Sequence, residues 1–136
     1  MNADTNAIIR TFLVAQSTLT DVISTRVYCP RLPENVTLPA IGYFTRGGDS
    51  HPYIPGLVTP SVQFDCWGDT PIAAREVYRA LYDVLQGVQF QNVVVDSTTY
   101  QIQSAIEEVQ GQDLQDVDIP DYYKVMTFFS IQIKAT

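Results

Sequence analysis

Residues 124 to 133 alternate between two classes of side chain without interruption. One set of alternate positions is mainly apolar and consists of Val125, Thr127, Phe129, Ile131 and Ile133; the other is mixed and consists of Lys124, Met126, Phe128, Ser130 and Gln132. Because successive side chains leave a strand on opposite faces, this period of two predicts a long strand with one buried face. Met126 and Phe128 lie on the more polar face, where helix packing or a neighbouring subunit has to cover them.

Further strands are expected upstream. In residues 62–67 apolar and polar positions alternate, which is typical of a half-buried antiparallel strand. Residues 40–45 are rich in strand formers and are followed by Gly47 and Gly48, which predict the end of that strand. These two strands are expected to form a hairpin. The other expected strands are 90–95, 98–109 and at most a short edge strand at 27–28.

Two helices carry clear start signals. Asp4 or Thr5 can cap a helix over residues 4–16, and a short second turn is expected before Ile23. Thr70 followed by Pro71 predicts the start of another helix, because the missing proline N–H costs nothing at the first helical position. This helix is expected over residues 71–86, before Gly87. Its buried stripe is predicted as Ala73, Val77, Ala80, Leu81 and Val84.

The element tally of two helices and about five strands predicts an α+β fold. A chain of 136 residues is expected to form one domain, spanning residues 1–136, with a core that requires neither disulfide nor metal. Cys29 and Cys66 either bridge two segments or, in a reducing compartment, stay buried and inert thiols. The sequence leaves this choice open and favours the thiols.

Charge and hydropathy exclude several classes of partner. The net charge of −7 has the wrong sign for binding phosphate groups, which argues against nonspecific nucleic-acid binding and against an electrostatic anchor on anionic lipid. No apolar run approaches the length of a membrane-spanning helix, and the start MNADTNAIIR lacks the pattern of a signal peptide. We therefore expect a soluble protein made in a cytoplasm, without a membrane partner.

The sequence offers no constellation for catalysis. The only histidine, His51, lies between Ser50 and Pro52, and adjacent side chains cannot face each other as nucleophile and base. One histidine and two scattered cysteines do not supply a typical zinc site. Glu107 and Glu108 are adjacent on an expected strand, so they point to opposite faces and cannot flank one bond. We expect neither enzymatic activity nor a cofactor.

Several short sequence segments, taken in their order along the chain, resemble one known family. They are Leu-Thr-Asp-Val at 19–22, RVYCPRLPENVTLPAIGY at 26–43, VQFDCWGDT at 62–70 and the helix PIAAREVYRALYDVL at 71–85. Together they resemble the tail-completion family of tailed bacteriophages, which includes tail terminators and tail-to-head joining proteins. The likeness covers residues 5–87, and the remainder is similar only in strand order.

The resemblance implies a mostly antiparallel sheet with both helices packed on one face. It implies a homo-oligomeric ring, commonly of six subunits, that caps the tail tube and docks onto the neck of the capsid. The expected partners are further copies of the chain, the tail tube protein and a neck or head-completion protein, with assembly in the host cytoplasm and a final place in the virion. DNA would pass through the ring without specific binding. A head-closure or adaptor protein and a small host-directed inhibitor are the alternatives.

Two segments are candidate sites on this interpretation. The connection at residues 47–59 is far longer than an ordinary hairpin turn and carries apolar side chains, so we expect a docking loop that stays mobile until a partner binds. The alternative is a plain long loop. Its candidate contact residues are Asp49, His51, Tyr53, Ile54 and Leu57.

The second segment is the acidic run at residues 107–121, which holds six carboxylates and no basic residue and is expected to be a solvated turn or long loop. Acidic groups that face the channel of a ring would repel the passing DNA duplex and keep it from sticking. A solvated outer loop is the alternative. The candidate channel-lining residues are Glu107, Glu108, Asp113, Asp116, Asp118 and Asp121.

Overall fold

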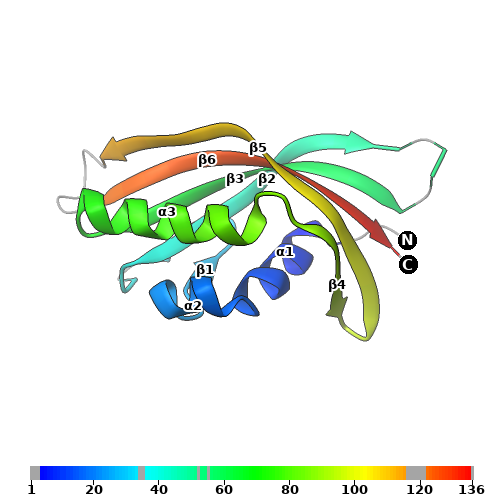
Figure 1. The fold of residues 1–136 in the computed structure, drawn as a ribbon, viewed down its shortest axis with the longest axis horizontal. Coiled ribbons are helices and arrows are strands. Elements are labelled where there is room, and N and C mark those ends of the chain that lie inside the picture. The colour runs from blue at the N-terminus through cyan, green and yellow to red at the C-terminus, as the bar shows by residue number, and fades with distance from the viewer. Residues whose placement is uncertain (1–3, 34–35, 52, 55, 116–121, 136) are drawn as a thin grey trace.

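The computed structural model describes residues 4–33, 36–51, 53–54, 56–115 and 122–135. Within these residues the chain forms three helices and six strands and has an α+β fold (Figure 1). The helices are α1 (Thr5–Val14), α2 (Ser17–Ile23) and α3 (Pro71–Leu85). The strands are β1 (Val27–Tyr28), β2 (Ala40–Ser50), β3 (Leu57–Gly68), β4 (Gln89–Val95), β5 (Thr98–Gln115) and β6 (Tyr123–Ala135).

The described strands form one curled sheet in the order β1-β2-β3-β6-β5-β4. All neighbours are antiparallel except β1 and β2, which are parallel, so the sheet is mixed. The C-terminal strand β6 lies in the centre, between β3 and β5. The three described helices lie on the concave side of the sheet, as Figure 1 shows, and its convex side carries no helix. The tally of two helices and about five strands did not count β1 and α2, which the sequence predicts only as a possible short edge strand and a short second turn.

The predicted helix starts are confirmed. The Asp4 side chain accepts a hydrogen bond from the Ala7 N–H at 3.2 Å, and Thr70 accepts one from the Ala73 N–H at 3.1 Å. Both caps satisfy an amide that has no partner inside the helix. Pro71 occupies the first turn of α3, as the sequence predicts.

The core lies between the helices and the concave side of the sheet. Its largest ring cluster is formed by Phe64, which lies 5.8 Å from Tyr43 on one side and 5.8 Å from Phe129 on the other, between ring centres. All three are at most 1% exposed. The predicted alternation in β3 and β6 is confirmed, because the buried positions are Val62, Phe64, Cys66, Val125, Thr127, Phe129, Ile131 and Ile133.

The buried stripe of α3 differs from the predicted one. Val77, Ala80 and Leu81 are buried as expected, but Ala73 and Val84 are only half-buried. The other buried positions are Ala74, Tyr78 and Leu85. The Tyr78 ring can be buried in this stripe because its hydroxyl donates a hydrogen bond to Glu107 of β5.

Both cysteines are free thiols. Cys66 is buried on the core side of β3, as expected, but Cys29 is exposed next to the edge strand β1. The expectation that both thiols are buried is therefore wrong for Cys29. Burial raises the pKa of the Cys66 thiol, which suits a small apolar side chain rather than a nucleophile.

Candidate docking surfaces

The β2–β3 hairpin extends well past the position where the sequence predicts a break. β2 continues through Gly47 and Gly48, and Ser50 still pairs with Val58 of β3. The register shifts between Thr45, which pairs with Val62, and Gly48, which pairs with Pro60, so a β-bulge lies between them at Arg46 and Gly47. A Cβ on Gly48 would lie 2.2 Å from the Thr59 carbonyl oxygen, and its φ is +129°, so only glycine fits there.

The prediction of a loop over residues 47–59 is therefore wrong for most of this segment, which belongs to the paired strands β2 and β3. Asp49 pairs with Thr59 within the hairpin, and Leu57 pairs with Lys134 of β6. The Ala135 N–H also donates to the Gly56 carbonyl oxygen at 3.0 Å, which fixes the base of the turn to the end of β6. A bulge and inter-strand hydrogen bonds keep the chain paired where glycines and prolines in the sequence predict a loop.

The tip of the hairpin brings together three of the five candidate docking residues. His51 is exposed, Tyr53 is 87% exposed and Ile54 is 40% exposed. Figure 1 shows this hairpin projecting beyond the body of the molecule, away from α3. An exposed aromatic and an aliphatic side chain at a projecting tip match the composition of protein-binding anchors. The mobility of this tip remains a prediction.

The convex side of the sheet forms a second surface, which we call the open face. Its half-buried aromatic residues are Phe44, Trp67 and Phe128, from β2, β3 and β6. Helices do not cover them, but a cation lies over two of the three rings: Arg46 lies 4.0 Å from the centre of the Phe128 ring, and Lys124 lies 5.2 Å from that of Trp67. The sequence predicts that a helix or a neighbouring subunit covers Phe128; within this chain it is the Arg46 guanidinium that lies over the ring.

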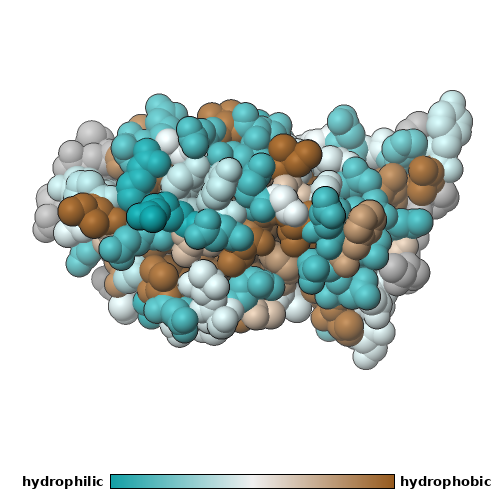
Figure 2. Space-filling model, viewed as in Figure 1, coloured by the Kyte–Doolittle hydropathy of each residue, from teal (hydrophilic) through white to brown (hydrophobic). Residues whose placement is uncertain are grey.

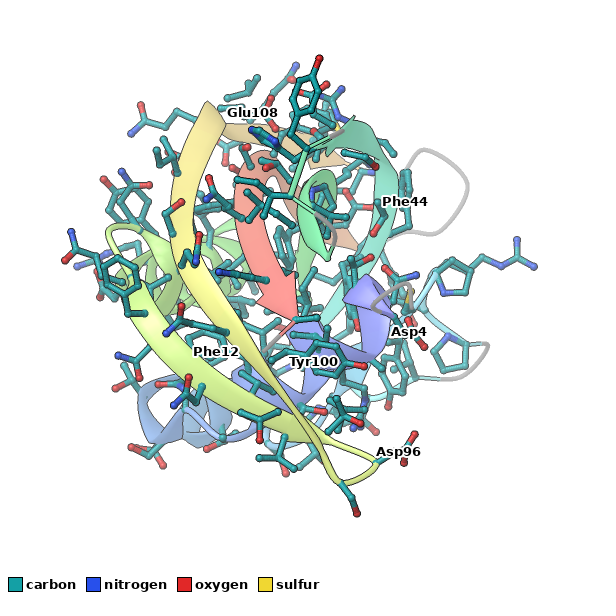
Figure 3. The ribbon with its side chains drawn as sticks, turned by 90° about the vertical axis from the view of Figure 1, so that its right-hand side faces the viewer. Asp4, Phe12, Phe44, Asp96, Tyr100 and Glu108 are labelled. Carbon is teal, nitrogen blue, oxygen red and sulfur yellow. The ribbon has the colours of Figure 1, made fainter. Side chains whose placement is uncertain are left out.

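A series of hydrogen-bonded side chains crosses the open face. The Arg46 Nε donates to the Ser61 hydroxyl at 3.0 Å, and this hydroxyl donates to Glu108 at 2.7 Å, which links β2, β3 and β5. Figure 3 labels Phe44 and Glu108, which lie on β2 and β5. The sequence analysis did not predict this series of hydrogen bonds. The signal that could have indicated it is the alternation of each strand, which places the side chains of Arg46, Ser61 and Glu108 on the face away from the core.

A half-buried carboxylate on the open face, that of Asp65, gives a pH-dependent prediction. Burial raises the pKa of Asp65, although Lys124, 4.0 Å away, opposes the shift. Ionising Asp65 therefore costs more free energy in the folded chain than in the unfolded chain. This cost lowers the free energy of unfolding at neutral pH, where Asp65 is ionised in the unfolded chain, and disappears below the ordinary carboxyl pKa, where it is protonated in both. We expect Asp65→Asn to raise the urea midpoint at pH 7 by a fraction of a molar unit, with the gain shrinking toward pH 4.

A double-mutant cycle with Lys124→Met provides the control. Removing the cation should lower stability at pH 7 when Asp65 is present and should cost less in the Asp65→Asn background. If Asp65→Asn lowers the midpoint at pH 7, the burial penalty is smaller than the pairing with Lys124 and the prediction is wrong.

The candidate acidic residues do not gather on one surface. The expected loop at 107–121 is corrected, because β5 continues to Gln115 and pairs with β6 as far as Tyr123. Glu108 points to the open face, whereas Glu107 points to the helix side, as expected for neighbours on a strand. Asp113 also turns to the helix side and bonds Arg75 of α3 at 2.9 Å. Asp116, Asp118 and Asp121 lie outside the described residues.

Glu107 has a structural role that the sequence did not reveal. Its carboxylate accepts from the Tyr78 hydroxyl at 2.7 Å and lies 2.7 Å from the hydroxyl of Thr127, a fully buried residue. Burial and the bond to Glu107 raise the pKa of Tyr78 to about 12. Gly111 leaves room for this contact, since a Cβ there would lie 2.8 Å from the Tyr78 ring. The channel-lining hypothesis stays a prediction, and Glu107 is a poor member of such a lining.

The described residues offer little for chemistry. Within them, no three histidine, cysteine or carboxylate side chains are grouped to hold a metal ion. Burial and the nearby Asp4 raise the pKa of Cys29, which disfavours its thiolate. Among the described helices, none is long and apolar enough to cross a membrane. On the face shown in Figure 2, hydrophobic residues are scattered among hydrophilic ones.

Comparison with solved structures gives an informative likeness. The sequence matches no protein-family model and no curated protein. Among solved structures, a chain described as "Virion of native gene transfer agent (GTA) particle" superposes with a TM-score of 0.65. The alignment covers 95% of this chain and 93% of that chain, at 14% sequence identity. The two chains share a fold.

Proposed function

We propose that this protein is a structural component of a phage-like virion and has no enzymatic role. The observation that carries the proposal is the fold shared, over nearly the full length of both chains, with a chain of a gene transfer agent virion particle. The tail-completion phrases in residues 19–85 favour the same conclusion from the sequence. The two lines of support are independent, because the sequence identity to that chain is only 14%.

Within the virion, the function we favour is that of a tail terminator or tail-to-head joining protein. Its copies would form a ring of six that caps the tail tube and docks it to the neck of the capsid. DNA would pass through this ring without specific binding, which the net charge of −7 supports. The partners in this proposal are further copies of the chain, the tail tube protein and a neck protein. A head-closure or adaptor protein is the alternative within the same particle.

The direct test is a completion assay. Tails from particles that lack this protein are mixed with the purified chain, and negative-stain electron microscopy and infectivity or transfer of DNA are measured. A terminator caps the tails and restores joining to filled heads. If the protein binds filled heads and leaves tails unchanged, the head-closure role replaces the terminator role. If it binds neither, the virion proposal fails.

The hairpin tip is expected to dock the protein onto its partner. Changing Tyr53 and Ile54 together to serine removes both apolar anchors and leaves the paired strands β2 and β3 intact. Central anchors of this kind contribute about 2 kcal/mol or more, so tail binding should weaken by about 30-fold. The measurement is binding of the labelled protein to purified tails.

The matched control is Ile72→Ser, which removes a similarly exposed apolar side chain, 74% exposed, from α3. This variant should bind tails like the wild type. Equal weakening in both variants, or none in the tip variant, would show that the hairpin is not the docking element.

A further inference from the structure

The end strand β4 lacks the residues that usually protect a sheet edge. Among the described strands, β5 is its only neighbour. Its sequence, Gln-Phe-Gln-Asn-Val-Val-Val, contains no charged residue, proline or glycine. Protein edges commonly carry charges, prolines or bulges that prevent strand pairing with other molecules, and an edge that lacks them is a template for another strand.

The hairpin geometry shows which backbone groups are available at this edge. A two-residue turn joins β4 to β5: Val95 pairs with Thr98, and Asp96 and Ser97 both have positive φ, at 49° and 67°. In such a hairpin the residues flanking the turn exchange hydrogen bonds, and the bonding residues then alternate along the strand. Asn92 and Val94 therefore direct their N–H and C=O groups away from β5. Figure 3 labels Asp96 at this turn.

Two apolar side chains of the same strand are exposed. Phe90 is 64% exposed and Val94 is 58% exposed. Phe90 also has a φ of 51°, a conformation that bulky residues rarely adopt, and its ring lies outside the core. The strand thus presents apolar side chains and available backbone groups at the same edge.

The register of β4 on itself is self-complementary. When a second copy is laid antiparallel with Asn92 opposite Asn92 of the partner subunit, Val94 lies opposite Phe90 of the partner subunit, and the reverse contact repeats by symmetry. The two available backbone edges then face each other. No like charges meet within the strand pair, although each chain carries a net charge of −7.

The surface next to the edge is also suited to a close approach. A groove of about 220 Å³ lies between β4 and α1, lined on the strand side by residues 91–94. On the helix side it is lined by Thr11, Phe12, Ala15 and Gln16, none of which is charged. Helix α1 therefore presents neutral side chains where a second copy would pack.

We propose that the free protein forms a two-fold dimer in which β4 pairs antiparallel with β4 of a second copy. The contact is isologous, so it closes at two subunits and produces one continuous sheet across both. It goes beyond the proposed virion function and does not rest on it. A ring would need a separate, heterologous contact; β6 and β5 lie between the projecting β2–β3 hairpin and the edge strand β4 in the sheet, so the proposed pairing does not use that hairpin.

The first test measures the mass of the free protein by sedimentation equilibrium. The wild type and the control Ile72→Lys should both be dimers, whereas Val94→Lys, which places two lysines in the interface, should raise the dimer dissociation constant at least tenfold. Circular dichroism establishes that each variant is folded. A wild type that stays monomeric at tens of micromolar overturns the proposal, and so does a Val94→Lys variant that dimerises like the control.

The second test traps the predicted register and does not depend on the lysine variant. Directly opposite side chains have Cβ atoms about 4.5–5.5 Å apart, close enough for a disulfide after a small adjustment. In a Cys29→Ser background, Asn92→Cys should give a covalent dimer on mild oxidation, far more than Ile72→Cys, which samples chance collisions. Equal yields from the two variants overturn the register. Tail completion is measured separately, so a failed dimer and a failed virion role are distinguishable.

Discussion

Replacing Phe64 by alanine is expected to destabilise the protein by about 3–5 kcal/mol. Phe64 is fully buried in the centre of the sheet and contacts the rings of Tyr43 and Phe129. Alanine removes the buried apolar surface and leaves a cavity between two rings that are held by other strands and cannot fully collapse. The measurement is the urea midpoint at constant m-value, followed by circular dichroism.

Phe64→Leu serves as the graded variant. Leucine retains most of the volume, so its cost should be well below that of alanine. An alanine variant that loses less than about 1 kcal/mol would contradict the cluster as the centre of the core, because surface substitutions cost that little.

Replacing Gly68 by alanine is expected to cost about 1–3 kcal/mol or more, because the new methyl group meets backbone atoms. A Cβ at Gly68 would lie 2.5 Å from the Ala74 backbone nitrogen and 2.9 Å from the Ala73 carbonyl carbon, in the first turn of α3. The helix start or the end of β3 has to shift. Thermal unfolding reports the loss, and hydrogen exchange of the first-turn amides of α3 reports its location.

Gly42→Ala is the matched control in the neighbouring strand β2. A Cβ there would lie 3.6 Å from the nearest atom, the Leu32 backbone nitrogen, which is an ordinary contact. Its stability should stay within about 0.5 kcal/mol of the wild type. Similar losses in the two variants would show that the close approach of β3 to α3 is not the cause, because Gly42 has no such contact and the lower chain entropy of alanine would by itself stabilise the fold.

Local signals in the sequence determined the helix starts and the faces of the strands. A capping residue and Pro71 act on amides within one turn, so Asp4 and Thr70 could be assigned without any tertiary contact. The alternation in β3 and β6 likewise fixes which side chains share a face, and it required only that one face be buried.

Only the tertiary structure decided where strands end and what their outward residues do. Gly48 ends a strand in isolation, yet pairing with β3 and the bulge carry β2 through it. The acidic stretch after Glu107 reads as a solvated loop, yet β6 pairs with it across a gap in sequence, and Tyr78, Thr127 and Arg75 satisfy its side chains.

The same holds for the candidate sites. Residues that are adjacent in the sequence, such as Glu107 and Glu108, serve opposite faces, whereas Arg46, Ser61 and Glu108 meet across three strands. The exposed edge of β4 exists because the C-terminal strand β6 occupies the centre of the sheet and leaves β4 at its end. Short-range sterics and helix capping depend on neighbouring residues and can be predicted from the sequence. Strand order depends on contacts between distant segments, which only the folded chain brings together.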